Sequence, residues 1–329
     1  MSANAATRLL QHYVDNFRSL PWRAPPGSPP PDPYVVWLSE VMLQQTTVAA
    51  VIPRFLRFVD RWPTVEALAA APETEVMQEW AGLGYYARAR NLIACARAVT
   101  MMCGFPSDEA GLRRLPGIGA YTAAAIAAIV FGQDTAPVDT NVERVVARLN
   151  GLAGKAAIRD AAAAMVPPGR AGDFAQAMMD LGASVCRPKS PLCHSCPVAG
   201  ECRAFALGTP EAFPPPKVRK ARPRRHGLAY WVERDGCVWL VRRPAKGMLG
   251  GMTALPGPDW QNEPGTIAIT ICVRHVFTHF VLDLAVVPKA EPEGEGWWQP
   301  IDLLGDAGLP TLYRRAADAV IAGRSALAA

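Results

Sequence analysis

Hydrophobic and polar residues follow two different periods along the chain. As far as residue 207, apolar residues recur every three or four positions, and short breaks rich in proline and glycine separate the runs. This spacing is typical of amphipathic helices that each bury one face. It predicts helices at Val35–Phe58, Val65–Ala70, Thr74–Leu83, Ala87–Met101, Ala120–Val130, Asn141–Leu149 and Phe174–Val185. Because strand patterns are nearly absent, we expect a helical domain over residues 1–207.

The period changes after residues 208–226. This segment is rich in proline, lysine and arginine and cannot form a packed core, which predicts a linker. Beyond it, two apolar runs meet at residues 234–236, where Arg-Asp-Gly favours a hairpin turn. Two further strands and a closing helix are expected at Thr266–Val273, Phe280–Val287 and Leu312–Ala322. Residues 227–329 are therefore expected to form a small α+β domain.

The composition excludes some classes of protein. Half of the 329 residues are hydrophobic, so a substantial core can be buried. No apolar run is as long as a membrane span and the first residues lack a signal-peptide pattern, so we expect a cytoplasmic protein. The net charge of +5 permits a nucleic-acid partner without proving one. Six lysines and arginines gather between residues 217 and 225.

Four of the eight cysteines lie within seventeen residues, at Cys186, Cys193, Cys196 and Cys202. In an intracellular protein such a cluster indicates metal ligands rather than disulfides. Structural zinc usually has two Cys-x2-Cys pairs that a longer loop separates, whereas a single tight loop holds all four cysteines here. The spacing therefore favours one compact [4Fe-4S] cluster over zinc and over unrelated buried cysteines.

A glycine-rich turn and an aspartate follow one another between the predicted helices. Gly117, Ile118 and Gly119 lie just before a helix, and their N–H groups, together with the helix N-terminus, could hold a phosphate. Asp139 follows about twenty residues later. Each feature has an ordinary explanation on its own, because plain turns join many helices and Asp139 could simply cap the next helix.

In combination these features resemble a known family. The hairpin, the following helix, the Val-Asp-Thr-Asn segment and the Cys-x6-Cys-x2-Cys-x5-Cys loop resemble the helix-hairpin-helix Gly/Pro-Asp superfamily of DNA glycosylases. Within it, the run Trp-Leu-Ser-Glu-Val-Met-Leu-Gln-Gln-Thr at residues 37–46 resembles the MutY-type adenine DNA glycosylases. The resemblance covers nearly the whole chain. It implies a helix-hairpin-helix at about 112–130 and a [4Fe-4S] loop at 186–202.

The chemistry of that superfamily needs two carboxylates. Cleavage of the glycosidic bond builds positive charge on the sugar, which one carboxylate stabilises while an acid assists the leaving base. Asp139 is the first candidate. Glu40 is the second, because its apolar neighbours would bury it and raise its pKa, although an exposed helical glutamate is the alternative. In the resemblance, Glu40 is the general acid at adenine N7, and Asp139 stabilises the oxocarbenium ion or a covalent intermediate formed from it.

The resemblance implies roles for further residues. Tyr121 and Asn141 assist catalysis, and Tyr121 stands where bifunctional relatives form a Schiff base through a lysine, which implies a monofunctional enzyme. Base flipping needs side chains that fill the gap, for which Gln44, Gln45 and Tyr85 are candidates, although one tyrosine of the pair at 85–86 is expected to pack in the core. The implied DNA- and base-binding residues of this half are Trp22, Arg23, Gln44, Gln45, Thr46, Val48, Leu83, Tyr85, Arg88, Gly117, Ile118, Gly119 and Asp180.

The C-terminal half resembles the Nudix-related domain of the same family. A working Nudix hydrolase needs a glutamate-rich helix to hold magnesium, and the sequence has none, so binding is expected rather than hydrolysis. Phe277, Thr278 and His279 resemble the Phe-Ser-His loop with which the family recognises 8-oxoguanine, since a hydroxyl distinguishes its N7–H from the N7 of guanine. An ordinary strand start is the alternative. Elsewhere, Thr140 and Glu143 depart from the family pattern without removing a catalytic carboxylate.

The sequence thus predicts a mainly α helix-hairpin-helix DNA glycosylase domain with a [4Fe-4S] loop, joined to an α+β Nudix-like domain. We expect a monomeric, monofunctional enzyme that flips out and removes adenine mispaired with 8-oxoguanine or guanine in double-stranded DNA. It would have no membrane partner and would associate with the nucleoid when bound to DNA. The alternatives are a thymine-mismatch or pyrimidine-lesion glycosylase of the same superfamily and an iron–sulfur redox or DNA-binding module.

Overall fold

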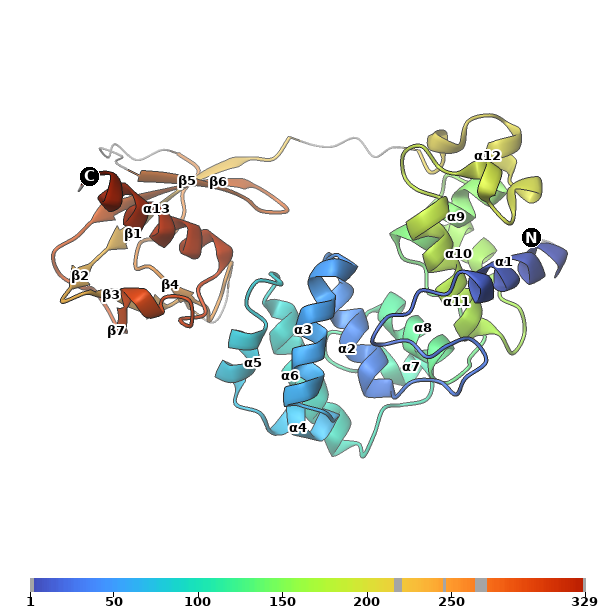
Figure 1. Cartoon of the computed structure of the whole chain (residues 1–329), viewed down its shortest axis with the longest axis horizontal. Helices are drawn as coiled ribbons and strands as arrows, with labels where there is room; N and C mark the ends of the chain where they lie inside the picture. The colour runs from blue at the N-terminus through green and yellow to red at the C-terminus, as the bar shows by residue number, and fades with distance from the viewer. Residues whose placement is uncertain (1–2, 216–220, 245–246, 264–270, 328–329) are drawn as a thin grey trace. The chain divides into compact units, whose positions relative to one another are not determined.

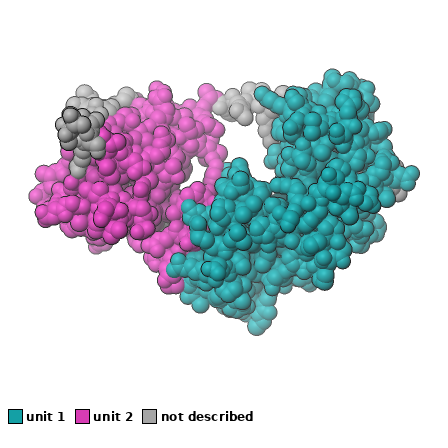
Figure 2. Space-filling view, in the orientation of Figure 1, with its two compact units in different colours: residues 1–71, 90–218 teal, residues 72–89, 219–329 magenta. Residues whose placement is uncertain are grey.

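The computed structural model describes residues 3–215, 221–244, 247–263 and 271–327 (Figure 1). The chain forms two compact units (Figure 2). Unit 1 contains residues 1–71 and 90–218, and unit 2 contains residues 72–89 and 219–329. Unit 2 therefore combines the C-terminal half with one short segment of the N-terminal half.

Unit 1 is built from helices, as the apolar periodicity predicts. They are α1 (Ala3–Asp15), α2 (Pro33–Leu43), α3 (Val48–Arg61), α4 (Val65–Ala70), α7 (Glu109–Leu112), α8 (Ala120–Ile129), α9 (Thr140–Asn150), α10 (Lys155–Ala164), α11 (Ala171–Asp180) and α12 (Arg203–Ala206). Helix α6 (Ala87–Met101) begins in unit 2 and continues into unit 1. Short helical turns occur at Leu181–Val185, Cys193–Ser195, Ala199–Glu201 and Pro210–Ala212.

The single helix predicted at Val35–Phe58 is wrong, because the chain breaks there into α2 and α3. Gln45 has a left-handed backbone with φ of 57°, which α2 cannot continue through. The Thr47 side chain then accepts a hydrogen bond from the Ala50 N–H and caps α3. Periodicity also misses α1, α7 and α10. Helix α7 has only four residues, and α10 is mostly alanine, so neither shows a clear apolar stripe.

Small residues let the helices of unit 1 approach closely around α8. Most of α8 is buried, and an added Cβ on Gly172 of α11 would lie 2.9 Å from the Ala128 carbonyl oxygen of α8. At the hairpin before α8, Gly117 has a φ of 75°, and a Cβ there would lie 2.6 Å from the Asn91 Cβ. These contacts pack the C-terminal end of α8 against the start of α11, and the hairpin before α8 against α6.

Unit 2 contains two small sheets, the helix α5 (Glu73–Glu79) and a long C-terminal helix. In the first sheet the order is β1 (Arg224–Trp231), β6 (Val281–Pro288) and β5 (Ile271–Val276), with β1 parallel and β5 antiparallel to β6. In the second, β3 (Cys237–Arg242) pairs antiparallel with β2 (Glu233–Arg234), β4 (Thr253–Ala254) and β7 (Gly296–Pro300). A short helical turn at Ile301–Leu303 precedes α13 (Thr311–Leu327).

The hairpin predicted at residues 234–236 is confirmed. Asp235 and Gly236 both have positive φ, of 49° and 71°, as the two central residues of a tight hairpin turn require. Of the strand predicted at Thr266–Val273, residues 271–273 lie in β5, and residues 264–270 lie outside the described part of the chain. The strands β4 and β7 are not predicted, since one is two residues long and the other breaks alternation with two adjacent tryptophans.

The core of unit 2 lies between its sheets and α13. Buried side chains from the strands and from α13 form one cluster, and Trp231, Leu240, Leu282, Leu284 and Tyr313 are among its members. This domain is therefore a sandwich of sheet and helix with its own apolar core. None of the helices that the structure describes is both long and apolar enough to cross a membrane.

Candidate active site

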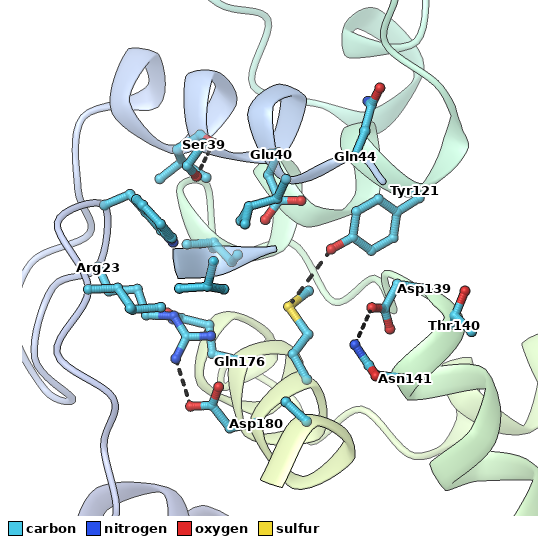
Figure 3. Close-up of a pocket in the computed structure, with 18 of the residues that line it drawn as sticks. Arg23, Ser39, Glu40, Gln44, Tyr121, Asp139, Thr140, Asn141, Gln176 and Asp180 are labelled. Atoms are coloured by element: carbon cyan, nitrogen blue, oxygen red, sulfur yellow. Dashed lines mark hydrogen bonds and ion pairs between the residues drawn. The ribbon is translucent and has the colours of Figure 1, made fainter. Parts of the chain in front are cut away.

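A cavity of about 600 Å³ opens in unit 1 and brings together all four predicted catalytic residues and seven of the predicted DNA- and base-binding residues (Figure 3). Its walls come from α2, α8, α9, α11 and the segment before α2. The predicted residues that line it are Trp22, Arg23, Glu40, Gln44, Gln45, Thr46, Val48, Tyr121, Asp139, Asn141 and Asp180. Residues that are far apart in the sequence thus form one concave surface.

Glu40 projects from the last turn of α2, surrounded by apolar side chains of the same helix. Only 7% of the residue is exposed. Burial raises the pKa of Glu40 from 4.5 to about 7, and the nearby Asp139 carboxylate adds to the rise, while the Tyr121 hydroxyl and the Arg23 guanidinium oppose it. The carboxyl is therefore suited to hold a proton close to neutral pH.

Asp139 occupies the N-cap of α9, so the capping interpretation of this residue is correct as far as it goes. One carboxylate oxygen accepts a hydrogen bond of 2.7 Å from the Val142 N–H, and the other accepts one of 2.9 Å from Asn141 Nδ2. The positive end of the helix dipole also favours an anion here. Because Asp139 lines the cavity as well, its cap holds a negative charge in a fixed orientation at the site.

Tyr121 stands at the start of α8, and its hydroxyl points toward the space between Glu40 and Asp139 (Figure 3). The hydroxyl contacts Met179 Sδ at 3.8 Å and also interacts with the Glu40 carboxyl. Burial and the two acids raise the pKa of Tyr121 well above its usual value, so it remains a neutral phenol. No lysine is among the described residues that line the cavity.

An ion-pair network closes the opposite wall of the cavity. Asp180 of α11 accepts from Arg23 at 2.6 Å and from Arg18 at 3.2 Å. Gln176, one helical turn before Asp180, also lines the cavity and is only 8% exposed. Sequence reasoning missed Gln176 and Arg18 as site residues. The signal for Gln176 was its spacing, since residues four apart share a helix face.

The predicted hairpin residues lie outside the cavity but keep the geometry of a helix start. Gly119 is the N-cap of α8 and has no side chain with which to cap the first turn. The backbone N–H groups of the first turn of α8 therefore receive no side-chain acceptor from residue 119. Ile118 is buried and anchors the turn. Such a turn can accept an anion in the way expected from the sequence.

Of the residues predicted to fill the gap that a flipped base leaves, Tyr85 belongs to unit 2, in the loop between α5 and α6, whereas Gln44 and Gln45 line the cavity of unit 1. Tyr86 is buried while Tyr85 is 46% exposed, so the expectation that one of the pair packs in the core is confirmed. Tyr85 has a positive φ of 49°, which is costly for a residue with a side chain. Arg88 holds the loop by donating to the Leu83 carbonyl at 2.9 Å, and its guanidinium lies over the Tyr85 ring.

Within unit 2, this loop meets the second predicted recognition segment. The Tyr85 hydroxyl is hydrogen-bonded to the Thr278 hydroxyl. Thr278 and His279 are exposed, and the turn that presents them is closed by a bond of 2.9 Å from the Phe277 N–H to the Phe280 carbonyl. The Phe277 ring packs at 4.7 Å from the Phe280 ring. Two segments that are predicted independently from the sequence are therefore adjacent.

The four clustered cysteines line a second cavity of unit 1, apart from the first. Its remaining lining is mainly apolar, with Val145, Leu149 and Val185 among the nearest residues. Across the described residues, no three side chains of the metal-ligating types converge closely enough to hold a single ion. In a cubane each cysteine binds a different iron, so the sulfurs need only surround a shared volume. Two buried arginines of α9, Arg144 and Arg148, contact Cys186.

Comparison with known proteins defines the class to which this fold and site belong. Residues 38–168 match the family described as HhH-GPD superfamily base excision DNA repair protein, and residues 227–319 match the NUDIX domain. A solved thermostable thymine-DNA glycosylase is 28% identical, with a TM-score of 0.56, and the match covers 61% of this chain and 95% of that one. The helix-hairpin-helix glycosylase fold class expected from the sequence is thereby confirmed.

Two curated relatives narrow the class. The adenine DNA glycosylase of Arabidopsis thaliana is 38% identical over 320 residues, which cover 83% of this chain and 51% of the relative. The adenine DNA glycosylase of Mycolicibacterium smegmatis is 42% identical over 61% of this chain and 70% of the relative. The chain belongs to the family of adenine DNA glycosylases. It spans about half the length of the Arabidopsis relative.

Proposed function

We propose that this protein is a monofunctional adenine DNA glycosylase that removes adenine mispaired with 8-oxoguanine or guanine. The observation that supports it most is the pairing of two carboxyl groups in one cavity. Glu40 is buried among apolar side chains, whereas Asp139 is held at a helix N-cap by two N–H donors. Two acids in such different environments can hold different protonation states at one pH.

Glu40 acts as the general acid. With a pKa of about 7 it is substantially protonated at neutral pH, so it can donate a proton to the departing base at N7. Protonation turns adenine into a better leaving group before the glycosidic bond breaks. Arg23 and Gln176, on the same cavity wall as Asp180, are positioned to hold the flipped base.

Asp139 stabilises the positive charge that develops on the sugar as the base leaves. The hydrogen bonds from the Val142 N–H and Asn141 Nδ2 fix the direction of its carboxylate, so little reorganisation is needed when the charge appears. Water then completes the hydrolysis. A transient bond from Asp139 to the sugar is compatible with the same geometry.

The absence of a lysine among the described cavity residues supports a monofunctional reaction. Strand cleavage by the bifunctional relatives depends on an amine that attacks the sugar and forms a Schiff base. Tyr121 occupies that place, and its phenol stays neutral because its pKa is raised. A neutral phenol can polarise or orient a neighbour, but it cannot form an imine.

We propose that unit 2 recognises the base that is paired with the adenine. Thr278 presents a hydroxyl beside the exposed ring of Tyr85, which combines a hydrogen-bonding group with a surface that can stack in the duplex. The hydroxyl can accept the N7–H that 8-oxoguanine has and guanine lacks. We place the domain boundaries at 1–207 and 227–329, with 208–226 as the linker.

Cys186, Cys193, Cys196 and Cys202 would hold a [4Fe-4S] cluster. The fit is supported by their shared apolar cavity and by two buried arginines that approach Cys186, since a cluster with four thiolate ligands is negatively charged. The cluster would supply a rigid cross-link for the loop after α11. The adenine chemistry above uses only Glu40, Asp139 and their neighbours.

The decisive experiment measures excision from duplexes that contain A:8-oxoG, A:G, T:G or thymine glycol. We expect excision of adenine alone, fastest opposite 8-oxoguanine, with abasic sites left uncleaved until alkali is added. Glu40→Gln should slow excision by about a hundredfold or more, whereas Glu66→Gln, which changes an exposed glutamate of α4 in the same chemical way, should not. Excision of thymine instead of adenine, or full activity in Glu40→Gln, would refute the proposal.

A further inference from the structure

Arg148, near the C-terminal end of α9, is a buried cation whose donors are almost all engaged. Only 2% of the residue is exposed. Its Nε donates to the Phe213 carbonyl at 3.1 Å, Nη1 to the Arg187 carbonyl at 2.7 Å, and Nη2 to the Pro188 carbonyl at 3.0 Å. Nη1 also donates to Cys186 Sγ at 3.4 Å. Every acceptor except the sulfur is a neutral carbonyl.

A second arginine lies one turn earlier on the same helix. Arg144 is 7% exposed and donates to the Cys186 carbonyl at 2.8 Å, the Gly182 carbonyl at 2.8 Å and Asn141 Oδ1 at 2.9 Å. Within the ranges that the structure describes, neither arginine forms an ion pair with a carboxylate. Like charges four residues apart on a helix repel, and a buried charge without a counter-ion is costly.

The four clustered cysteines lie beside these two buried charges. Both guanidinium groups converge on Cys186, and Arg148 faces the cavity that the four clustered cysteines line. The Cys202 sulfur in turn lies 3.5 Å from the Arg148 carbonyl oxygen. Four thiolates around a [4Fe-4S] core carry a net negative charge, which would balance the buried cations. Neutral thiols would leave Arg148 without a negative charge beside its guanidinium, whereas the Asp139 carboxylate also acts on Arg144.

We propose that Arg148 is the internal counter-cation of the cluster and sets its reduction potential through the N–H to Cys186 Sγ. This inference rests on the cofactor proposed above and is independent of the DNA substrate. A positive charge and an N–H···S hydrogen bond both stabilise the more negative state of a cluster, so they raise its reduction potential. The same guanidinium also donates to the carbonyl of Phe213, a residue within the proposed linker 208–226.

A purely structural role is the competing explanation, because Arg148 also joins three backbone carbonyls. The two roles differ in what they do to the potential. If Arg148 only holds the loop in place, which we call the clamp role, its loss changes the rate at which iron is released. If Arg148 is a counter-cation, its loss also shifts the reduction potential of clusters that retain all their iron. Arg187 provides a matched control. It adjoins Cys186 in the sequence but is exposed, and its guanidinium donates to the Ser190 carbonyl.

The test uses the full-length, iron-loaded protein and three variants, Arg148→Met, Arg148→Lys and Arg187→Met. Film voltammetry would give the cluster potential, and absorbance of a ferrous chelator would give the rate of iron release. We expect Arg148→Met to lower the potential and to release iron about tenfold faster, as the loss of a hydrogen bond to a charged group implies. Arg187→Met should change neither, because water screens an exposed charge.

Arg148→Lys keeps the charge but loses the planar fork, so its potential should lie between those of Arg148→Met and the unaltered protein. This variant decides the matter if Arg148→Met cannot be isolated with its iron. A potential unchanged in Arg148→Lys and in any loaded Arg148→Met would overturn the proposal and leave only the clamp. Unaltered protein that contains zinc and no iron would instead refute the cofactor, and adenine excision would be judged separately.

Discussion

The buried Glu40 makes the pH dependence of base excision a direct test of the proposed mechanism. Its pKa rises from 4.5 to about 7, mainly because burial disfavours the charged carboxylate. The rise corresponds to roughly 3 kcal/mol in favour of the protonated form, at about 1.36 kcal/mol for each pH unit. We expect the excision step to be fast where Glu40 is protonated and to slow by about tenfold for each pH unit above 7.

The assay is single-turnover excision from an A:8-oxoG duplex, measured from about pH 5.5 to about pH 9, with DNA binding followed at each pH by fluorescence anisotropy. Glu40→Gln has no proton to lose, so it should be slow at every pH and show no decline near 7. Tyr121→Phe keeps the acid but removes a hydroxyl that lowers its pKa, so its decline should begin at a higher pH than that of the unaltered protein.

A rate that stays constant from neutral to alkaline pH while binding persists would refute the assignment of Glu40 as the acid. A decline retained in Glu40→Gln would assign the titration to another group. Stability provides an independent readout. Because the folded pKa lies above the unfolded value, Glu40 contributes fully to stability below about pH 4.5, and this contribution is lost as the pH rises through about 7. Relative to Glu40→Gln, the free energy of unfolding should fall across that window.

Three further predictions follow from the geometry. Asp139→Asn keeps the helix cap but removes the charge that stabilises the sugar cation. Single-turnover excision should therefore fall by at least about a hundredfold, while thermal stability changes little. Near-normal excision would contradict the proposed role of Asp139 in stabilising the cation. Thr278→Ala and Tyr85→Phe should each reduce the preference for A:8-oxoG over A:G by about fivefold, the factor expected for one hydrogen bond. The double variant should lose less preference than the product of the two single losses, because the two hydroxyls are bonded to each other. Fully multiplicative losses would show that the two residues act separately. Gly117→Ala should lower the free energy of unfolding by about 1–3 kcal/mol in thermal unfolding. The loss should exceed that of Gly132→Ala, because both glycines have positive φ but only the Cβ at residue 117 would meet a neighbour, Asn91. Equal losses would mean that backbone strain alone matters.

The sequence was most informative where one residue has one local reason for its position. Asp139 could be predicted at a helix start because aspartate is a common N-cap residue and a helical pattern begins directly after it. Glu40 could be foreseen as buried because its helix is apolar on every side. The hairpin at 234–236 follows from turn chemistry. These features depend on only a few neighbouring residues.

Features that depend on distant contacts could not be read in this way. The break between α2 and α3 depends on the left-handed backbone of Gln45, which nothing in its side chain requires. Gln176 becomes a cavity residue only because α11 crosses α8 at Gly172. The bond between Tyr85 and Thr278 joins residues 193 positions apart. In the sequence alone, Arg144 and Arg148 have the spacing of an exposed charged helix face, and only the fold shows that both are buried.

The two carboxyl groups of the active site show how helix geometry can assign opposite roles to the same functional group. In the last turn of α2, the backbone N–H groups are already bonded within the helix, so the Glu40 carboxyl gains nothing from them and burial makes the protonated form favourable. At the start of α9, the N–H groups of the first turn have no partners within the helix, and Asp139 accepts from one of them. The same dipole that stabilises this carboxylate would oppose its use as an acid. Exchanging the two side chains, even with their volumes matched, would therefore place a charge where it is costly and a proton where it is not needed. The position of each acid relative to its helix, rather than its residue type, determines which one gives the proton and which one meets the cation.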